Sequence, residues 1–392
     1  MLNRLGASFR IFYNSQRFTG VLLIVCTAFS LFVANSPIGD GYIHFWTGSS
    51  QTESSHAIHL SPLFIVNDIL MAIFFLLVGV EIKREAMAGE LSSFLRASLP
   101  VAAAAGGMLV PALLYHLFNS GSPTSGGWGI PMATDIAFAI GILSLLGSRV
   151  PDALKILLTA IAVADDLGAV LVIAIFYSDG IQSSWLIVTL LLMVLLFFMN
   201  KKRVESLWPY LLTGCILWYS LHMTGVHATI SGVLLAFFIP YDALRHNDPL
   251  QRLEHLLYRP VNHFIMPVFA LANTAVAIRM DWQDLFGSAL GIGILAGLMV
   301  GKPLGIFSFV WIAVRLGWSK LPGGVNHLQI LGIGLLGGIG FTMSMFVTML
   351  AFPASGFADS AKISILVASC ISGLAGLAVL SKAINSEKNL AA

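Results

Sequence analysis

Long apolar runs alternate with short polar segments along most of the chain. A run of about 17–25 apolar residues is long enough to cross the hydrocarbon core of a bilayer as an α-helix. The pattern therefore predicts an all-α polytopic membrane protein with about twelve transmembrane helices. The expected spans fall near residues 19–35, 62–82, 97–118, 128–147, 153–177, 184–200, 207–223, 226–240, 260–278, 286–314, 328–351 and 361–382.

Composition supports a chain embedded in lipid. Of its 392 residues, 57% are hydrophobic and only 10% are charged, against about 25% charged in a soluble domain. The net charge of +2 gives no reason to expect nucleic-acid binding. All three cysteines, Cys26, Cys215 and Cys370, lie in apolar runs, so we expect packing residues rather than disulfides or metal ligands. No cofactor is expected.

The basic residues predict how the chain is oriented. With the N-terminus placed in the cytoplasm, every Lys and Arg falls in a cytoplasmic loop or tail except Arg279, Lys302 and Lys362. Positive charge is enriched on the cytoplasmic side of membrane proteins. The alternation therefore favours an even number of spans with both termini in the cytoplasm. Lys302 is the exception that lies within a span.

The longest polar loop, about residues 36–61, lies on the opposite side. Its stretch HFWTGSSQTESSHAIHL, residues 44–60, is compatible with a hairpin around Gly48–Ser50. A solvated linker without regular structure is the alternative, and the sequence does not decide between the two.

Two of the predicted spans are poor continuous helices. The span at 128–147 contains Pro131 and the polar pair Thr134–Asp135, and proline removes a backbone donor from the helix. The span at 328–351 carries five glycines before Phe341–Thr342. Close packing through small residues is one explanation. The other is a pair of interrupted helices crossing near the midplane, each in a trio of spans (3–5 and 10–12) related as inverted-topology repeats.

Four charged side chains fall within these trios, namely Asp135, Asp165, Asp166 and Lys302. Charges at membrane depth are costly and usually functional. Successive helical residues differ by about 100° in direction, so Asp165 and Asp166 cannot face the same way. We expect Asp165 to pair with Lys302, the basic residue at that depth, and Asp166 to face the ion path. Asp135 and Lys302 are suited to offset the dipoles of broken helix ends.

These residue types suit a hard monovalent cation. Asp165, Asp166 and Thr134 offer oxygen ligands for Na⁺ or Li⁺, and the same carboxylates bind protons. A site that holds either ion exchanges one for the other.

Several motifs also resemble one known family. ATDIAFAIG at 133–141, ADDLGA at 164–169, GVHATISG at 225–232, LAGLMVGKPLGI at 295–306 and GIGFTMS at 338–344 resemble the NhaA family of Na⁺/H⁺ antiporters. FFLLVGVEIKRE at 74–85 extends the similarity over nearly the whole chain. That family is itself a standard example of inverted-topology repeats.

The resemblance implies a pH-regulated secondary antiporter that exports Na⁺ or Li⁺ while about two protons enter. It implies a multi-pass protein of the bacterial inner membrane, with cytoplasmic termini, that forms a homodimer through residues 44–60. The chain would be one transporter domain, with a core bundle at about 97–177 and 286–382 and an interface part at about 19–82 and 184–278. Asp165 and Asp166 would form the ion site, supported by Asp135, Thr134 and Lys302.

The resemblance further implies a pH-responsive set of residues, under which activity rises from neutral to alkaline pH. The matching positions are Glu81, Arg84, Glu85, His227, Arg252, Glu254 and His255. Judged from spacing alone, Glu81, Arg84 and Glu85 could equally form a solvated, salt-bridged helix face. Three residues after the LEH motif this chain has Tyr258 where the family has a second histidine, which puts the pH profile in question.

Other functions fit the sequence less well. An intramembrane aspartyl protease would carry its two aspartates on separate helices, whereas here they are adjacent, so we expect no enzyme. An ion-coupled symporter of an organic anion is the alternative on the same architecture, but it calls for a more polar cavity. A channel is disfavoured because buried charges of both signs suit binding and release better than free conduction.

Overall fold

The computed structural model describes residues 16–48, 61–178, 182–243, 245, 248–278, 286–353 and 356–391. Within these ranges every regular element is a helix. Arg4, Arg10 and Arg279, used above for orientation, lie outside them. The first half of the chain comprises α2 (Gln16–Ala34), α3 (Gly39–Thr47), α4 (Pro62–Phe64), η1 (Ile65–Leu70), α5 (Met71–Ala88), α6 (Phe94–Asn119), η2 (Ser125–Met132), α7 (Ile136–Leu143), η3 (Ser144–Arg149), α8 (Asp152–Phe176) and α9 (Ser183–Lys201).

The second half contains the remaining helices. These are α10 (Leu207–Thr224), α11 (Ile230–Phe238), α12 (Pro249–Pro260), η4 (Val261–Ile265), α13 (Met266–Asn273), α15 (Ala289–Ala296), η5 (Gly297–Gly301), α16 (Lys302–Arg315), α17 (His327–Gly337), α18 (Phe341–Ala351) and α19 (Phe357–Ala391). Helices α12, η4 and α13 follow one another without a break, as do α15, η5 and α16.

Both predicted interruptions are present. After the 3₁₀ helix η2, which contains Pro131, the backbone becomes extended at Ala133 and helix α7 begins only after Asp135. The chain between α17 and α18 breaks at Gly338–Gly340, and the two helices are bent by 46°. The breaks touch each other, because the Asp135 amide donates to the Ile339 carbonyl oxygen at 2.7 Å.

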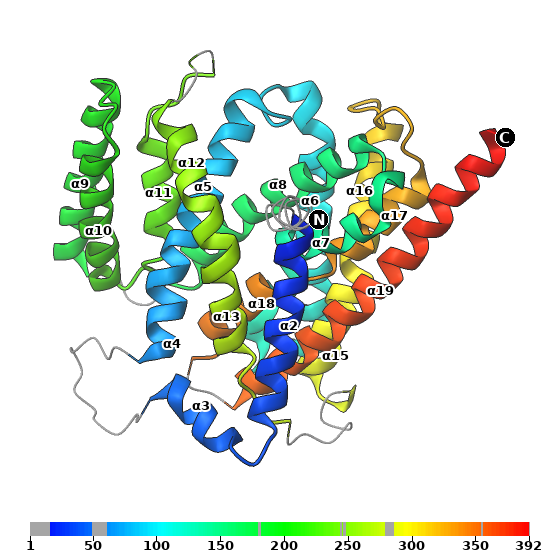
Figure 1. Cartoon of the computed structure of the whole chain (residues 1–392), viewed down its shortest axis with the longest axis horizontal. Helices are drawn as coiled ribbons and strands as arrows, with labels where there is room; N and C mark the ends of the chain where they lie inside the picture. Colours follow the sequence, from blue (N-terminus) through cyan, green and yellow to red (C-terminus); the bar gives the residue numbers. More distant parts are fainter. Residues whose placement is uncertain are drawn as a thin grey trace, which may run out of the picture.

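The helices around these breaks pack closely. Helix α6 lies against α16, and α17 lies against α19; Figure 1 shows them together on one side of the molecule, with α9, α10 and α11 on the other. At the α6–α16 contact a Cβ on either Gly106 or Gly305 would overlap the carbonyl oxygen of the other. Glycine is therefore needed at both positions for the two backbones to approach this closely.

Seven helices in the described residues are long and apolar enough to cross a membrane, or nine if each of two bent pairs counts as one span. This agrees with a multi-pass membrane protein but does not confirm twelve spans. The expected division near Gly225 is present, since α10 ends at a left-handed glycine with φ of 84°. The helix that follows, α11, has only nine residues, about 14 Å at 1.5 Å per residue, so the expected span at 226–240 is helical over only part of its length.

Two expectations from the sequence are wrong. Residues 44–47, the first arm of the expected hairpin, belong to helix α3, in which Tyr42 packs edge-on against Trp46 one turn later, and Gly48 ends the helix with φ of 72°. Residues 49–60 lie outside the described ranges. Lys83, counted above as a loop charge, is buried in α5 and donates to the Phe237 carbonyl oxygen at 2.8 Å and to that of Ile239. It thereby caps the C-terminal end of α11, where cations are favourable.

Candidate functional site

The structure confirms the ion pair between Asp165 and Lys302. Lys302 Nζ lies 2.6 Å from Asp165 Oδ2, and both side chains are buried. Lys302 also donates to the Met132 carbonyl oxygen, at the last residue of η2. Because carbonyl groups at a helix end are left without partners, this contact places positive charge where one broken helix stops.

Thr134 connects the two breaks beside this pair. Its hydroxyl lies 2.7 Å from Asp165 Oδ2 and 3.0 Å from the carbonyl oxygen of Gly337, the last residue of α17. Its one proton serves one of these acceptors at a time. Asp165 Oδ2 thus has the Lys302 ammonium as one donor and the Thr134 hydroxyl as a second donor within reach. Asp165 Oδ1 is buried and accepts from no described residue.

Asp135 caps the N-terminal ends of two different helices. Its Oδ1 accepts from the Phe138 amide of α7 at 2.9 Å. Its Oδ2 accepts from the Thr342 amide of α18 at 3.1 Å and from the Thr342 hydroxyl at 2.6 Å. A carboxylate at a helix N-terminus satisfies free amides and offsets the positive end of the dipole. The role suggested for Asp135 from its place in the sequence agrees with these contacts.

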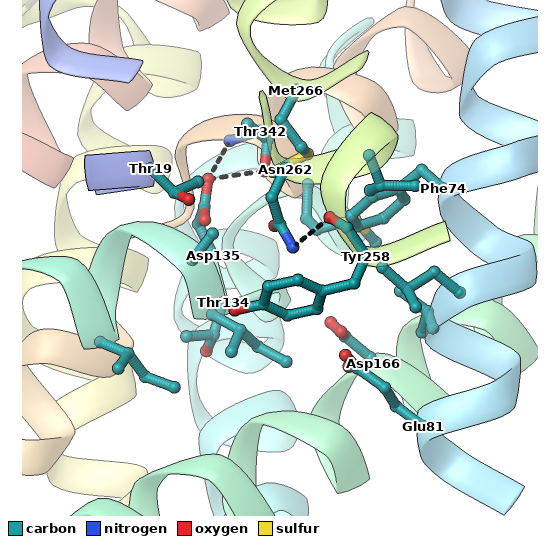
Figure 2. Close-up of a pocket in the computed structure, with 17 residues that line it drawn as sticks. Thr19, Phe74, Glu81, Thr134, Asp135, Asp166, Tyr258, Asn262, Met266 and Thr342 are labelled. Atoms are coloured by element: carbon teal, nitrogen blue, oxygen red, sulfur yellow. Dashed lines mark hydrogen bonds between the residues drawn. The ribbon is translucent and has the colours of Figure 1, made fainter. Parts of the chain in front are cut away.

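Asp166 differs from Asp135 and Asp165 because its carboxylate has neither a hydrogen-bond donor nor a cation beside it in the described part of the chain, and its Oδ1 atom is buried. Only 2% of Asp166 is exposed, yet the residue lines a cavity that Asp165 does not line. Figure 2 shows the Asp166 carboxylate beside that of Glu81, with Tyr258 and Thr134 near it. An unsatisfied buried acceptor is costly, more so when it is charged. A proton or a cation would satisfy it.

The cavity is small and lined by oxygen-bearing groups. It offers about 80 Å³ to the centres of water molecules, which is room for a few waters. Carboxylates of Asp135, Asp166 and Glu81 line it together with the hydroxyls of Thr19 and Thr134. Oxygen ligands and retained waters are what a hard cation needs. The lining therefore fits a partly hydrated monovalent cation better than an organic solute.

The residues expected to respond to pH do not form one cluster. Arg84 pairs with Glu254 across helices and lies 3.2 Å from Glu85. Glu81 lies within electrostatic range of Arg84, Glu85 and Glu254, and it also lines the Asp166 cavity. Arg252 donates at 2.8 Å to the carbonyl oxygen of Glu205, in the loop between α9 and α10.

The two predicted histidines are also separate from the Arg84 pairs. His255 is exposed on α12. His227 lies in the turn between α10 and α11, within electrostatic range of Asp68. The structure thus brings together Glu81, Arg84, Glu85 and Glu254, places Glu81 in the lining of the Asp166 cavity as well, and leaves His227, Arg252 and His255 elsewhere.

Some residues at the site were not predicted from the sequence. Thr342 was noticed only as part of the glycine-rich motif, although it supplies two donors to Asp135. Its position directly after a run of glycines at a helix break was an available signal. Thr19 and Asn262 also line the cavity, but nothing in their sequence context distinguishes them from other polar residues in apolar runs. Tyr258, noticed as a departure from the family pattern, proves to line the cavity as well.

Apolar helices packed around two broken helices, with buried charges at the point where the breaks meet, are characteristic of ion-transporting membrane proteins. Comparison with known proteins agrees with this class. Residues 10–380 match the family model described as Na⁺/H⁺ antiporter 1. The chain belongs to this family.

Curated relatives resemble it along almost their whole length. The Na⁺/H⁺ antiporter NhaA of Cytophaga hutchinsonii is 49% identical over 369 residues, covering 94% of each chain. NhaA 1 of Flavobacterium johnsoniae is 47% identical over 386 residues, covering 98% of this chain and 100% of the relative. NhaA of Citrobacter koseri is 45% identical over 370 residues, covering 93% and 95%.

Proposed function

We propose that this protein is a Na⁺/H⁺ antiporter in which Asp166 alternately holds the proton and the cation. The observation that carries this proposal is the state of the Asp166 side chain. It is buried, its Oδ1 accepts from no described residue, and it lines a cavity with room for a few water molecules. The names of the curated relatives and the family model support the same exchange.

The exchange follows from competition at one carboxylate. With Asp135 balanced by two helix N-terminal ends and Asp165 by Lys302, Asp166 is the aspartate of these three that has no partner among the described residues. A proton neutralises it, and so does Na⁺ or Li⁺. Only one of them can be bound at a time, so each ion displaces the other.

A second proton would come from the neighbouring ion pair. If the cation also takes an oxygen of Asp165, the Asp165–Lys302 pair is disturbed, and a proton leaves either the carboxyl or the ammonium group. This gives about two protons per cation. The pair lies one residue from Asp166 in the same helix, α8, which supports the coupling.

The alternative, symport of an organic anion, is less compatible with the site. Its cavity is small and three carboxylates line it, so an anion would meet like charge. We likewise propose that the chain is a transporter and not an enzyme. Asp165 Oδ2 contacts Lys302 and Thr134 instead of sharing a proton with a second carboxylate.

The proposed architecture has twelve spans, with the trios at 97–177 and 286–382 as inverted repeats and the breaks near the midplane. The contact between Gly106 and Gly305, one in the first helix of each trio, is consistent with such symmetry. We propose that the protein lies in the bacterial inner membrane with both termini in the cytoplasm. The end carrying Arg84 and Glu254 then faces the cytoplasm and α3 faces outward. A homodimer whose interface includes residues 44–60 completes the proposal.

Regulation by pH is proposed for the groups that flank the cavity. Glu81 lines the cavity with Asp166, while Arg84 on the next turn ties α5 to α12 through Glu254. A change in the charge of these groups would alter both the field at Asp166 and the packing of α5 on α12. Activity is expected to rise from neutral to alkaline pH, as protons compete less well with the cation.

The test uses inside-out membrane vesicles with an acidic interior. Added Na⁺ should release protons from the wild-type vesicles, and Asp166→Asn should abolish this response. Asp152→Asn, at an exposed position on the same helix, is the matched control and should behave like wild type. An unchanged response in Asp166→Asn would remove Asp166 from the mechanism. The absence of any Na⁺ or Li⁺ response in the wild type between about pH 6 and 9 would refute the antiporter assignment.

A further inference from the structure

The phenol ring of Tyr258 lies within the cavity that contains Asp166. Both residues line this cavity. Figure 2 shows the ring lying across it, with the Asp166 carboxylate on one side, that of Asp135 on the other, and the hydroxyl end directed toward Thr134. An uncharged aromatic side chain therefore fills part of the space between the two carboxylates.

Contacts on both sides of Tyr258 along the chain hold this ring in place. One turn before it in α12, Glu254 pairs with Arg84 of α5. One turn after it, the Asn262 side chain donates to the Tyr258 carbonyl oxygen at 2.9 Å and also lines the cavity. A tyrosine side chain has only two rotatable bonds, so its ring has little freedom once the backbone is fixed. The space beside Asp166 is therefore well defined.

Such a space can distinguish ions that the charge of Asp166 cannot. Li⁺, Na⁺ and K⁺ carry the same charge and differ in size and in how tightly they hold water. The cavity offers about 80 Å³ to the centres of water molecules, which is room for a few waters. Cavity size, ligand number and rigidity decide between cations of similar chemistry. The larger K⁺ ion with its waters would need more space than this cavity provides.

Tyr258 is also a wall that can be shortened without leaving a closed hole in the core. It is only half-buried, whereas Phe74 and Thr134, which line the same cavity, are buried. A smaller side chain at Tyr258 would enlarge the cavity toward the surface, and water would fill the added space. A larger hydrated cation could then reach Asp166.

We propose that Tyr258 is a specificity-determining residue, whose ring restricts the Asp166 cavity to Na⁺ and Li⁺ by filling the space that K⁺ and its waters would need. This inference rests on the proposed antiport function, because it concerns which cation competes with the proton at Asp166. The volume of the ring carries the effect, and the hydroxyl group is not required. Phenylalanine should therefore replace Tyr258, and alanine should not.

The test compares cations in inside-out membrane vesicles with an acidic interior. Proton release is titrated with Na⁺, Li⁺ and K⁺ in turn, at constant ionic strength. In Tyr258→Ala the ratio of the KM for K⁺ to the KM for Na⁺ should fall at least about fivefold, the factor that one contact of hydrogen-bond strength supplies. Tyr258→Phe should keep the wild-type ratio. Leu256→Ala, at a position 60% exposed on the same helix, is the matched truncation control and should also keep it.

The ratio separates selectivity from stability, because a general loss of folded protein lowers the response to every cation alike. An unchanged ratio in Tyr258→Ala would overturn the proposal. So would an equal fall in Tyr258→Phe, since the hydroxyl group would then be the determinant.

A larger side chain provides a second test that does not depend on Tyr258→Ala folding. Tyr258→Trp should narrow the cavity and raise the KM for Na⁺ more than the KM for Li⁺, and equal changes would contradict the proposal. Equal responses of the wild type to Na⁺ and K⁺ would refute the size restriction and leave antiport intact. A wild type without any Na⁺ response would overturn both.

Discussion

Replacing Lys302 by methionine should destabilise the protein strongly. Methionine keeps most of the aliphatic stem but removes the ammonium group that pairs with Asp165 at 2.6 Å and donates to the Met132 carbonyl oxygen. Removing one partner of a buried ion pair typically costs about 3–5 kcal/mol. Part of this cost is the carbonyl group left without a donor, about 1–3 kcal/mol. For a chain of this size the loss corresponds to a fall in the melting temperature on the order of 5–10 °C.

The assay is thermal unfolding of the purified protein in detergent, followed by size-exclusion chromatography. A double variant, Asp165→Asn with Lys302→Met, separates loss of charge balance from loss of packing. It should be more stable than Lys302→Met alone, because a neutral buried pair no longer contains an unbalanced charge. The difference in melting temperature between Lys302→Met and the wild type should also shrink at acidic pH, because the acid form of Asp165 needs no counter-charge. If Lys302→Met and the wild type have the same melting temperature at pH 8, Lys302 does not stabilise Asp165.

Two further predictions concern packing and the cavity. Gly106→Ala should lower stability by about 1–3 kcal/mol, because its Cβ would overlap the Gly305 carbonyl oxygen, whereas Gly41→Ala, with open space around it, should not; equal melting temperatures would refute the close contact. Glu81→Gln should raise the KM for Na⁺ roughly 3–10-fold, because Glu81 shares the cavity of Asp166 and interacts with it electrostatically. Glu85→Gln, paired with Arg84 instead, should leave the KM nearly unchanged, and an equal effect of both variants in vesicle transport would argue against a specific role for Glu81.

Local chemistry made much of the fold predictable. Pro131 lacks a backbone donor and the glycines before Phe341 permit non-helical backbone, so both breaks were visible in the sequence. Helix α3 was not, because a short polar loop containing aromatic residues is compatible with a hairpin as well as a helix. The i,i+4 contact between Tyr42 and Trp46 stabilises the helix only after the turn that brings the two rings together has formed.

The site was predictable where the choice of partners was narrow. Lys302 was the basic residue at the depth of Asp165, so their pairing followed from elimination. The bond between Asp135 and Thr342 could not be derived, because it depends on where two segments 207 residues apart meet. That Glu81 lines the cavity and Arg84 does not has a similar origin. Residues three apart on a helix, such as Glu81 and Arg84, share a face. The packing of α12 decides which of them reaches the cavity.

The two caps made by Asp135 restrict how this protein can move. One carboxylate holds the first turns of α7 and α18, which come from the two trios, and the Asp135 amide binds the break between α17 and α18. Sliding one trio past the other would break the bonds from Asp135 to Thr342 and Ile339 together. The crossing therefore acts as a single rigid block. We therefore expect the proposed ion path to open and close at the boundary of this block, where α2, α5, α12 and α13 complete the wall around Asp166.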